Sequence, residues 1–111
     1  DITAIGTNGI AASVMLKAGA DRAASGENPL IVACRKADII IGPIGIVIAD
    51  SLLGEVTPKM AVAVAQSSAK KLFIPFNQCD NVIVGVPDLS MKTLMASLMT
   101  ELQKIMEGEG C

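Results

Sequence analysis

The chain contains no histidine, tryptophan or tyrosine, and phenylalanine occurs only at Phe73 and Phe76. Without histidine, a Ser-His-Asp triad, a Cys-His pair and a His-ligated metal site cannot be built within the chain. Any general acid or base must therefore be an Asp, Glu, Lys or Cys side chain. Aromatic platforms and a basic surface are typical of nucleic-acid binding, and a net charge of −2 with a pI near 4.9 provides neither. We expect no nucleic-acid partner and no metal.

Long apolar runs are also absent. The longest, Ile39–Ala49, is interrupted by two glycines and a proline and falls short of the roughly 18 residues that a membrane span requires. No signal peptide is recognisable. The three cysteines, Cys34, Cys79 and Cys111, lack Cys-x-x-Cys spacing, and an odd number without framework spacing is typical of a reducing compartment. We expect a cytoplasmic protein with no membrane partner.

The residues that are present favour an α/β fold. The chain of 111 residues is 51% hydrophobic, mostly aliphatic, with a mean hydropathy of +0.55, which suits strands buried on both faces of a parallel sheet. Strand-like and helix-like segments alternate, which predicts one α/β domain over residues 1–107 and a frayed tail at 108–111. Strands are predicted at Ile2–Ile5, Ala20–Ala24, Asp38–Ile41, Leu72–Phe76 and Val82–Val86, and helices at Ile10–Ala18, Pro29–Lys36, Ile46–Leu53, Pro58–Ser68 and from Asp88 or Ser90 to Glu107.

Capping residues and apolar spacing give finer expectations. Asn28 before Pro29, and Thr57 before Pro58, are N-cap and N1 pairs. The first pair, with Arg35 and Lys36 in the last turn, favours a helix over the alternative of a strand at Leu30–Ala33. Ile10 and Val14 are expected to face the core, with Met15 as a third candidate. A stripe of helical period on the last helix is expected to pack on the sheet or, alternatively, to form an oligomer interface; it consists of Met91, Met95, Leu98, Leu102 and Ile105.

An Ile-Gly-x-x-Gly-Ile pattern occurs twice, at residues 5–10 and 41–46. Each copy follows a predicted strand and precedes a predicted helix, so it indicates a strand-to-helix turn with bare backbone N–H groups at a helix N-terminus, where an anion can bind. Alternatively, the glycines serve tight turning and close helix-to-strand packing. Neither copy satisfies the six-residue dinucleotide fingerprint.

Ligands of open α/β sheets bind beyond the carboxyl ends of the strands. Four polar or glycine-rich loops are expected to meet at that edge, and they supply the candidate ligand-binding residues: Thr7, Asn8, Gly9, Ser25, Gly26, Glu27, Asn28, Gly42, Pro43, Ile44, Gly45 and Asn77. Helix capping by Thr7, Asn8 and Asn28 is the simpler interpretation of those three.

Two residues are candidates for chemistry. Glu27 is the first choice for an acid, a base or a ribose-binding carboxylate, although a glutamate near a helix start is also favoured by the helix dipole. Cys79 follows a predicted strand and could carry a reactive thiol, although a loop cysteine without a nearby base is usually inert.

Several stretches together resemble an uncharacterised bacterial family of short proteins. They are Ile5-Gly-Thr-Asn, Met15–Asp21, Gly26-Glu-Asn, Asp38–Ala49 and Leu53–Pro58, and the resemblance continues to about Val86. It implies a three-layer Rossmann-like domain with a mostly parallel sheet. It also implies a further strand, glycine-rich loop and helix before the segment that opens this chain, so the first β-α unit is expected to be missing here. The family has no established activity and gives no catalytic residues.

Three functions are therefore compared. The first is binding of a nucleotide, dinucleotide or other phosphorylated small molecule at the carboxyl edge of the sheet. The second is a non-catalytic scaffold that forms a homo-oligomer through its apolar helices. The third is a small enzyme that uses Glu27 or Cys79 at the same edge.

Overall fold

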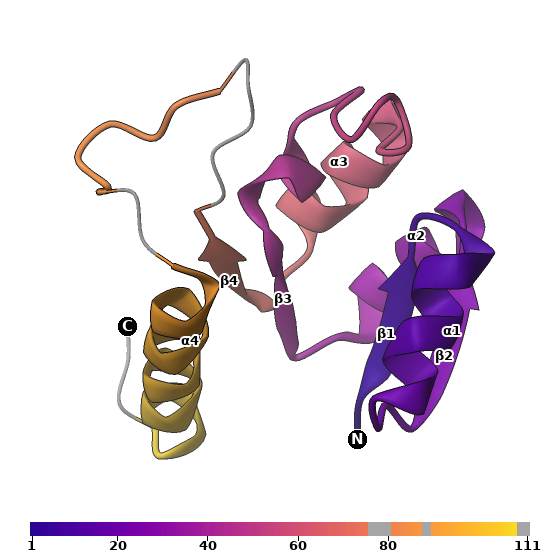
Figure 1. Ribbon diagram of the computed structural model, residues 1–111. Helices are drawn as coiled ribbons and strands as arrows, with labels where there is room; N and C mark the ends of the chain where they lie inside the picture. Colours follow the sequence, from indigo (N-terminus) through magenta and orange to yellow (C-terminus); the bar gives the residue numbers. More distant parts are fainter. Residues whose placement is uncertain (76–80, 88–89, 109–111) are drawn as a thin grey trace.

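The computed structural model describes residues 1–75, 81–87 and 90–108 (Figure 1). Strands and helices alternate along the described chain, which confirms the predicted α/β class. The elements are β1 (Thr3–Gly6), α1 (Gly9–Lys17), β2 (Arg22–Ser25), α2 (Glu27–Lys36), β3 (Ile39–Pro43), the 3₁₀ helix η1 (Ile44–Val47), α3 (Pro58–Gln66), β4 (Lys70–Ile74) and α4 (Met91–Met106). None of the described helices is long and apolar enough to cross a membrane.

The strands form two separate two-stranded parallel sheets. β1 pairs with β2, with Ala4 opposite Ala23, and β3 pairs with β4, with Ile40 opposite Lys71. In the view of Figure 1 the order is β4, β3, β1, β2, with α4 beside β4 and α1 over β1 and β2. The parallel pairing was predicted, and it occurs in two small sheets rather than in one continuous sheet.

Each sheet has an edge that no described strand covers. Ile2 and Gly6 accept backbone hydrogen bonds from the side of β2, at 3.2 Å from Arg22 and 3.1 Å from Gly26. Because alternate residues of a strand point to opposite neighbours, the backbone groups of Thr3 and Ile5 point away from β2.

The same holds for β3. Lys70 donates its backbone N–H to the carbonyl of Asp38 at 3.0 Å, so the polar backbone groups of Ile39 and Ile41 point away from β4. Each sheet therefore has an edge whose backbone donors and acceptors are paired with no described strand.

The core lies around α2, α3 and the segment that leads into α3. Val56, Met60 and Ala61 are buried together, with Leu30 and Leu52 packed against them. Val64, one turn further along α3, is almost completely buried. A hydrogen bond of 2.7 Å from Ser67 Oγ to the carbonyl of Cys34 joins α3 to α2. Most of the buried side chains of the described chain thus lie on or beside this helix pair.

The start of α2 corrects the prediction. The helix begins at Glu27, not at Pro29, and its N-cap is Gly26 with φ +102°, so Asn28 lies in the first turn and is not a cap. Glycine reaches this φ without steric cost, and the Gly26 N–H donates to the carbonyl of Gly6 at 3.1 Å. The Thr57 cap was predicted correctly: its hydroxyl accepts from the Met60 N–H, and Pro58 is the first residue of α3.

The predicted helix Ile46–Leu53 is wrong. The chain forms only the four-residue η1 and then a series of turns in which Asp50, Leu52 and Leu53 have φ between 55° and 65°. Two hydrogen bonds close this loop, from the Asp50 N–H to the Val56 carbonyl at 2.7 Å and from the Val56 N–H to the Ser51 carbonyl at 3.2 Å. Together they place Val56 in the core beside Met60 and Ala61. A continuous helix to Leu53 would lack these two hydrogen bonds. β-branched residues in the stretch also lower its helix propensity.

The inward face of α1 is also corrected. Ile10 and Val14 are 80% and 60% exposed, and the buried residue is Ala12. The reason is the close approach of α1 to β1: a Cβ on Gly6 would lie 2.6 Å from the Ala12 backbone nitrogen. Only small side chains fit between backbones at that separation, so an alanine face packs on the strand.

The predicted strand Val82–Val86 is wrong. No strand forms at 82–86, and Val82 and Val84 are exposed. A strand requires a neighbour for its backbone hydrogen bonds, and neither of the described sheets includes residues 82–86. Asn77 and Cys79 lie outside the described residues.

α4 begins as predicted, with Ser90 as its N-cap. It lies beside β4 (Figure 1), and its stripe residues from Met95 onward are half-buried, whereas Met91 is exposed.

Candidate functional site

The turn between β1 and α1 contains the first glycine pair. Asn8 is the N-cap of α1: its Oδ1 accepts from the Ala11 N–H at 2.9 Å. Its Nδ2 donates to Glu55 Oε1 at 2.9 Å. Gly6 is required for packing against α1, whereas a Cβ on Gly9 would meet nothing within 4 Å. The two glycines of this turn therefore have different roles, and the space beside Gly9 is open.

The turn between β2 and α2 presents a carboxylate. Glu27 Oε1 accepts a hydrogen bond of 2.5 Å from the hydroxyl of Thr57, and the same hydroxyl accepts from the Met60 N–H at 3.2 Å. Glu27 in the first turn of α2 thus reaches the N-cap of α3. Its charge lies near two helix N-termini, where the helix dipoles favour a negative group.

The turn after β3 contains the second glycine pair. A Cβ on Gly42 would approach Ile46 Cδ1 at 2.8 Å, and Gly45 is buried with its carbonyl accepting from Ser51 Oγ at 2.6 Å. Pro43 carries no N–H. For Gly42 and Gly45 these contacts favour the packing interpretation over an open anion-binding loop.

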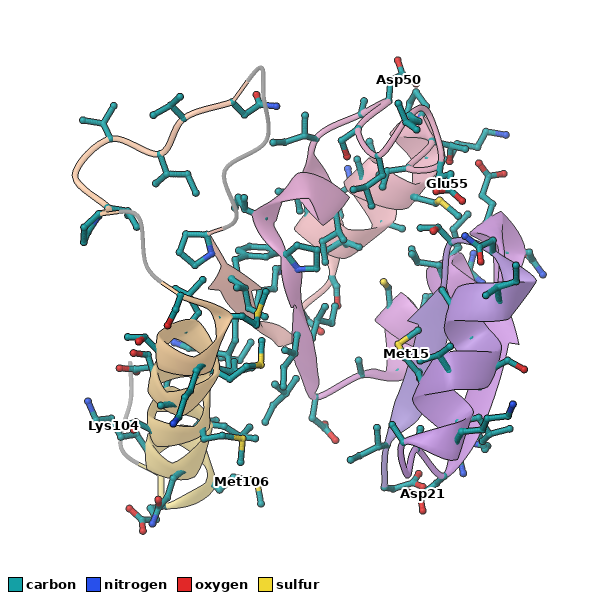
Figure 2. The ribbon with its side chains drawn as sticks, viewed as in Figure 1. Met15, Asp21, Asp50, Glu55, Lys104 and Met106 are labelled. Atoms are coloured by element: carbon teal, nitrogen blue, oxygen red, sulfur yellow. The ribbon has the colours of Figure 1, made fainter. Side chains whose placement is uncertain are left out.

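Two of the predicted loops meet at one edge. The segment from Glu55 to Thr57 joins them, because Glu55 binds Asn8 and Thr57 binds Glu27. Figure 2 shows Asp50 and Glu55 at one end of the molecule and Asp21 at the opposite end. We call the residues 7–9, 25–28 and 50–57 the carboxyl edge.

The sequence prediction did not include Glu55, and it treated Thr57 only as a cap. A signal was present in Glu55-Val-Thr-Pro58, where a carboxylate stands just before a helix start.

The charge of the carboxyl edge is negative. Glu27, Asp50 and Glu55 contribute carboxylates, and residues 7–9, 25–28 and 50–57 include no lysine or arginine. The described residues contain no group of three or more His, Cys, Asp or Glu side chains that could hold a metal. Within these residues, positive potential can come only from backbone N–H groups at the helix N-termini.

Parallel β-α units, with two of their connecting loops gathered at one polar edge, define the chain as an α/β protein. It belongs to a family described as Domain of unknown function (DUF3842), whose model matches residues 1–107. The expected membership of an uncharacterised family is thereby confirmed. No curated protein and no solved structure matches the chain.

Proposed function

We propose that this domain binds a nucleotide or another phosphorylated small molecule at the carboxyl edge. The observation that carries the proposal is the pair of hydrogen bonds Asn8–Glu55 and Thr57–Glu27, which bring the first turns of α1, α2 and α3 to one polar edge. Such an edge combines backbone donors for an anion with carboxylate acceptors for hydroxyl groups. The Rossmann-like layering predicted from the resemblance is part of this proposal.

The backbone at the start of α1 would hold the anion. The N–H groups of the first helical turn lack intrahelical partners; that of Ala11 is satisfied by Asn8, which leaves those of Gly9 and Ile10 for a ligand. The absence of a side chain at Gly9 keeps them accessible, since nothing lies within 4 Å of the Cβ position there.

The carboxylates would hold the polar remainder of the ligand. Glu27 and Glu55 each have a second oxygen beyond the one that Thr57 or Asn8 uses, and a carboxylate can accept from the two hydroxyls of a ribose. Since the edge has no lysine or arginine, it suits the pyrophosphate of a dinucleotide better than a free triphosphate, whose charge three carboxylates would repel.

The test is a thermal-shift panel of NAD, NADP, FAD, ATP, coenzyme A and S-adenosylmethionine. A ligand at about 100 times its Kd stabilises the folded state by roughly 2.7 kcal/mol. Gly9→Leu should abolish the shift by covering the amides, and Ala18→Leu, which places the same side chain at the exposed other end of α1, should preserve it. A panel with no shift, or a shift that Gly9→Leu leaves intact, would contradict the proposal.

A specific observation also supports the scaffold alternative. α4 exposes Met91, Met99 and Met106, and methionine adapts readily to partner surfaces. Under this alternative the protein forms a homo-oligomer through α4, and Met99→Glu should convert it to a monomer in native mass spectrometry. A wild-type monomer would contradict the alternative.

A further inference from the structure

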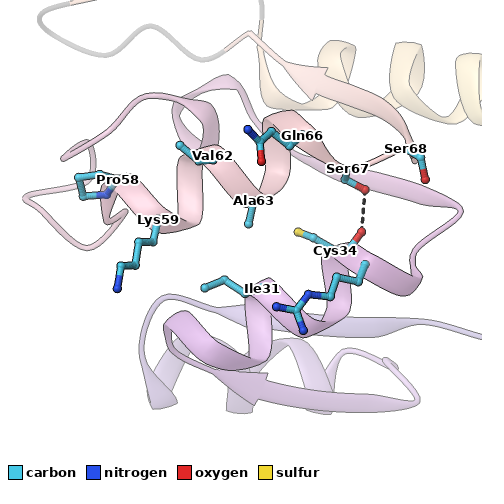
Figure 3. Close-up of a pocket in the computed structure, with 10 residues that line it drawn as sticks. Ile31, Cys34, Pro58, Lys59, Val62, Ala63, Gln66, Ser67 and Ser68 are labelled. Carbon is cyan, nitrogen blue, oxygen red and sulfur yellow. Dashed lines mark hydrogen bonds between the residues drawn. The ribbon is translucent and has the colours of Figure 1, made fainter.

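A pocket of about 680 Å³, open to solvent, lies between α2 and α3 and begins at Pro58, just beyond the carboxyl edge. Figure 3 shows Ile31 of α2 and Ala63 of α3 facing each other across it. Val62 adds a further apolar side chain to the lining. The volume falls in the range of small-molecule sites, about 300–1,000 Å³, and none of the predicted site residues lines it.

Two hydrogen bonds join the two helices, one at each end of the pair, and so fix the distance between them. Thr57 binds Glu27 at one end of the pair, and Ser67 binds the carbonyl of Cys34 at the other. At 1.5 Å per residue these ties stand about 15 Å apart along α3. The pocket is therefore formed mainly by the helix pair, and Ser67 and Ser68 of the segment that follows α3 complete its lining.

The lining carries positive charge without a compensating carboxylate. Arg35 and Lys59 line the pocket, and its other lining residues include no Asp or Glu. Within the described residues neither cation forms an ion pair. Arg35 lies in the last turn of α2 and Lys59 in the first turn of α3. An apolar centre is thus flanked by two available cations.

We propose that this pocket binds a small aliphatic carboxylate. The hydrocarbon chain would lie over Ile31, Val62 and Ala63, and the carboxylate would pair with Arg35 or Lys59. A carboxylate matches the charge of the lining, and the apolar centre distinguishes such an acid from an inorganic anion. This site is separate from the nucleotide proposal and does not depend on it.

The experiment is an NMR titration of the intact protein with sodium octanoate, monitored at the methyl groups of isoleucine and valine. Saturable shifts are expected at Ile31 and Val62, and 1-octanol should bind more weakly because it lacks the charge. The double variant Arg35→Gln with Lys59→Gln removes whichever cation the carboxylate pairs with. It should weaken octanoate binding by about threefold to fivefold, the upper range for one exposed ion pair. Both side chains are exposed, so the variant should fold normally.

The control is Lys36→Gln, which removes an adjacent exposed charge of α2 that does not line the pocket; its affinity should match the wild type. Three results would overturn the proposal: no saturable shifts, larger shifts at the exposed Ile10 and Val14 of α1 than at Ile31 and Val62, or an unchanged affinity in the double variant. Gly9→Leu should leave octanoate binding intact, which separates this outcome from that of the nucleotide proposal.

Discussion

The hydroxyl of Thr57 donates a 2.5 Å hydrogen bond to Glu27 and accepts another from the Met60 N–H. A single side chain thus caps α3, connects it to the start of α2 and orients a carboxylate of the proposed site. The same contact joins the two helices that line the pocket at one end of the pair.

Loss of that hydroxyl should destabilise the fold. Thr57→Val keeps the shape of the side chain but removes the cap and the Glu27 contact, so the free energy of unfolding should fall by about 1–3 kcal/mol. Thr57→Ser retains the hydroxyl, so its free energy of unfolding should fall by less than about 0.5 kcal/mol. Urea denaturation followed by circular dichroism measures both, and equal losses in the two variants would show that the hydroxyl has no such role.

The two glycines of the first turn should respond oppositely to alanine. Gly6→Ala places a Cβ 2.6 Å from the Ala12 backbone nitrogen, so α1 must shift and about 2 kcal/mol or more should be lost. Gly9→Ala enters open space at a helical position and should be neutral or stabilise by up to about 1 kcal/mol. Thermal denaturation of the two variants compares them directly, and a tolerated Gly6→Ala would contradict the packing assigned to this turn.

Hydrogen exchange should alternate along the uncovered strand edges. The amides of Ala4 and Ile40 point into their sheets, whereas those of Ile5 and Ile41 point away from β2 and β4. We expect faster exchange at Ile5 and Ile41, in two-dimensional NMR spectra recorded after transfer to D₂O. Uniform slow exchange along both strands would mean that another strand covers these edges in solution.

Cys34 should make stability depend on alkaline pH. Burial raises the pKa of the Cys34 thiol above its ordinary value, and the nearby Lys71 opposes this by a smaller amount. The folded state therefore retains the thiol proton at a pH where the unfolded chain has lost it. The resulting stabilisation is complete below the pKa of the thiol in the unfolded chain and is lost as the pH rises through the higher folded value.

Cys34→Ala isolates this contribution. The difference in unfolding free energy between wild type and variant should shrink from pH 8 to pH 10, because the cavity left by the substitution costs the same at both values. Urea denaturation at the two pH values measures it. A constant difference would show that the thiol titrates alike in the folded and unfolded chains.

Local chemistry explains which parts of the fold could be predicted. Thr57-Pro58 and Ser90 cap helices through their own hydroxyls, and such signals depend only on adjacent residues. The face of α1 could not be predicted in this way, because the approach of α1 to Gly6 decides that Ala12 is buried and Ile10 exposed. The loop after η1 likewise depends on Val56 reaching the core, a contact formed by tertiary packing.

The candidate site also has a part that could be predicted from the sequence and a part that depends on tertiary packing. The gathering of Asn8 and Glu27 follows from strand direction and was predictable, whereas Glu55 joins them only through the fold of the 50–57 loop. The three-layer Rossmann-like arrangement stays a prediction, and so does any role of Asn77 or Cys79, which lie outside the described residues.

Calorimetric titration with the dinucleotide that gives the largest thermal shift tests the nucleotide-binding proposal most directly. We expect saturable one-site binding to the wild type and an unchanged Kd for Ala18→Leu. A folded Gly9→Leu variant should bind at least about tenfold more weakly, because it loses charge-assisted contacts at two amides. Equal affinity for the wild type and Gly9→Leu would place the ligand elsewhere and contradict the proposed site.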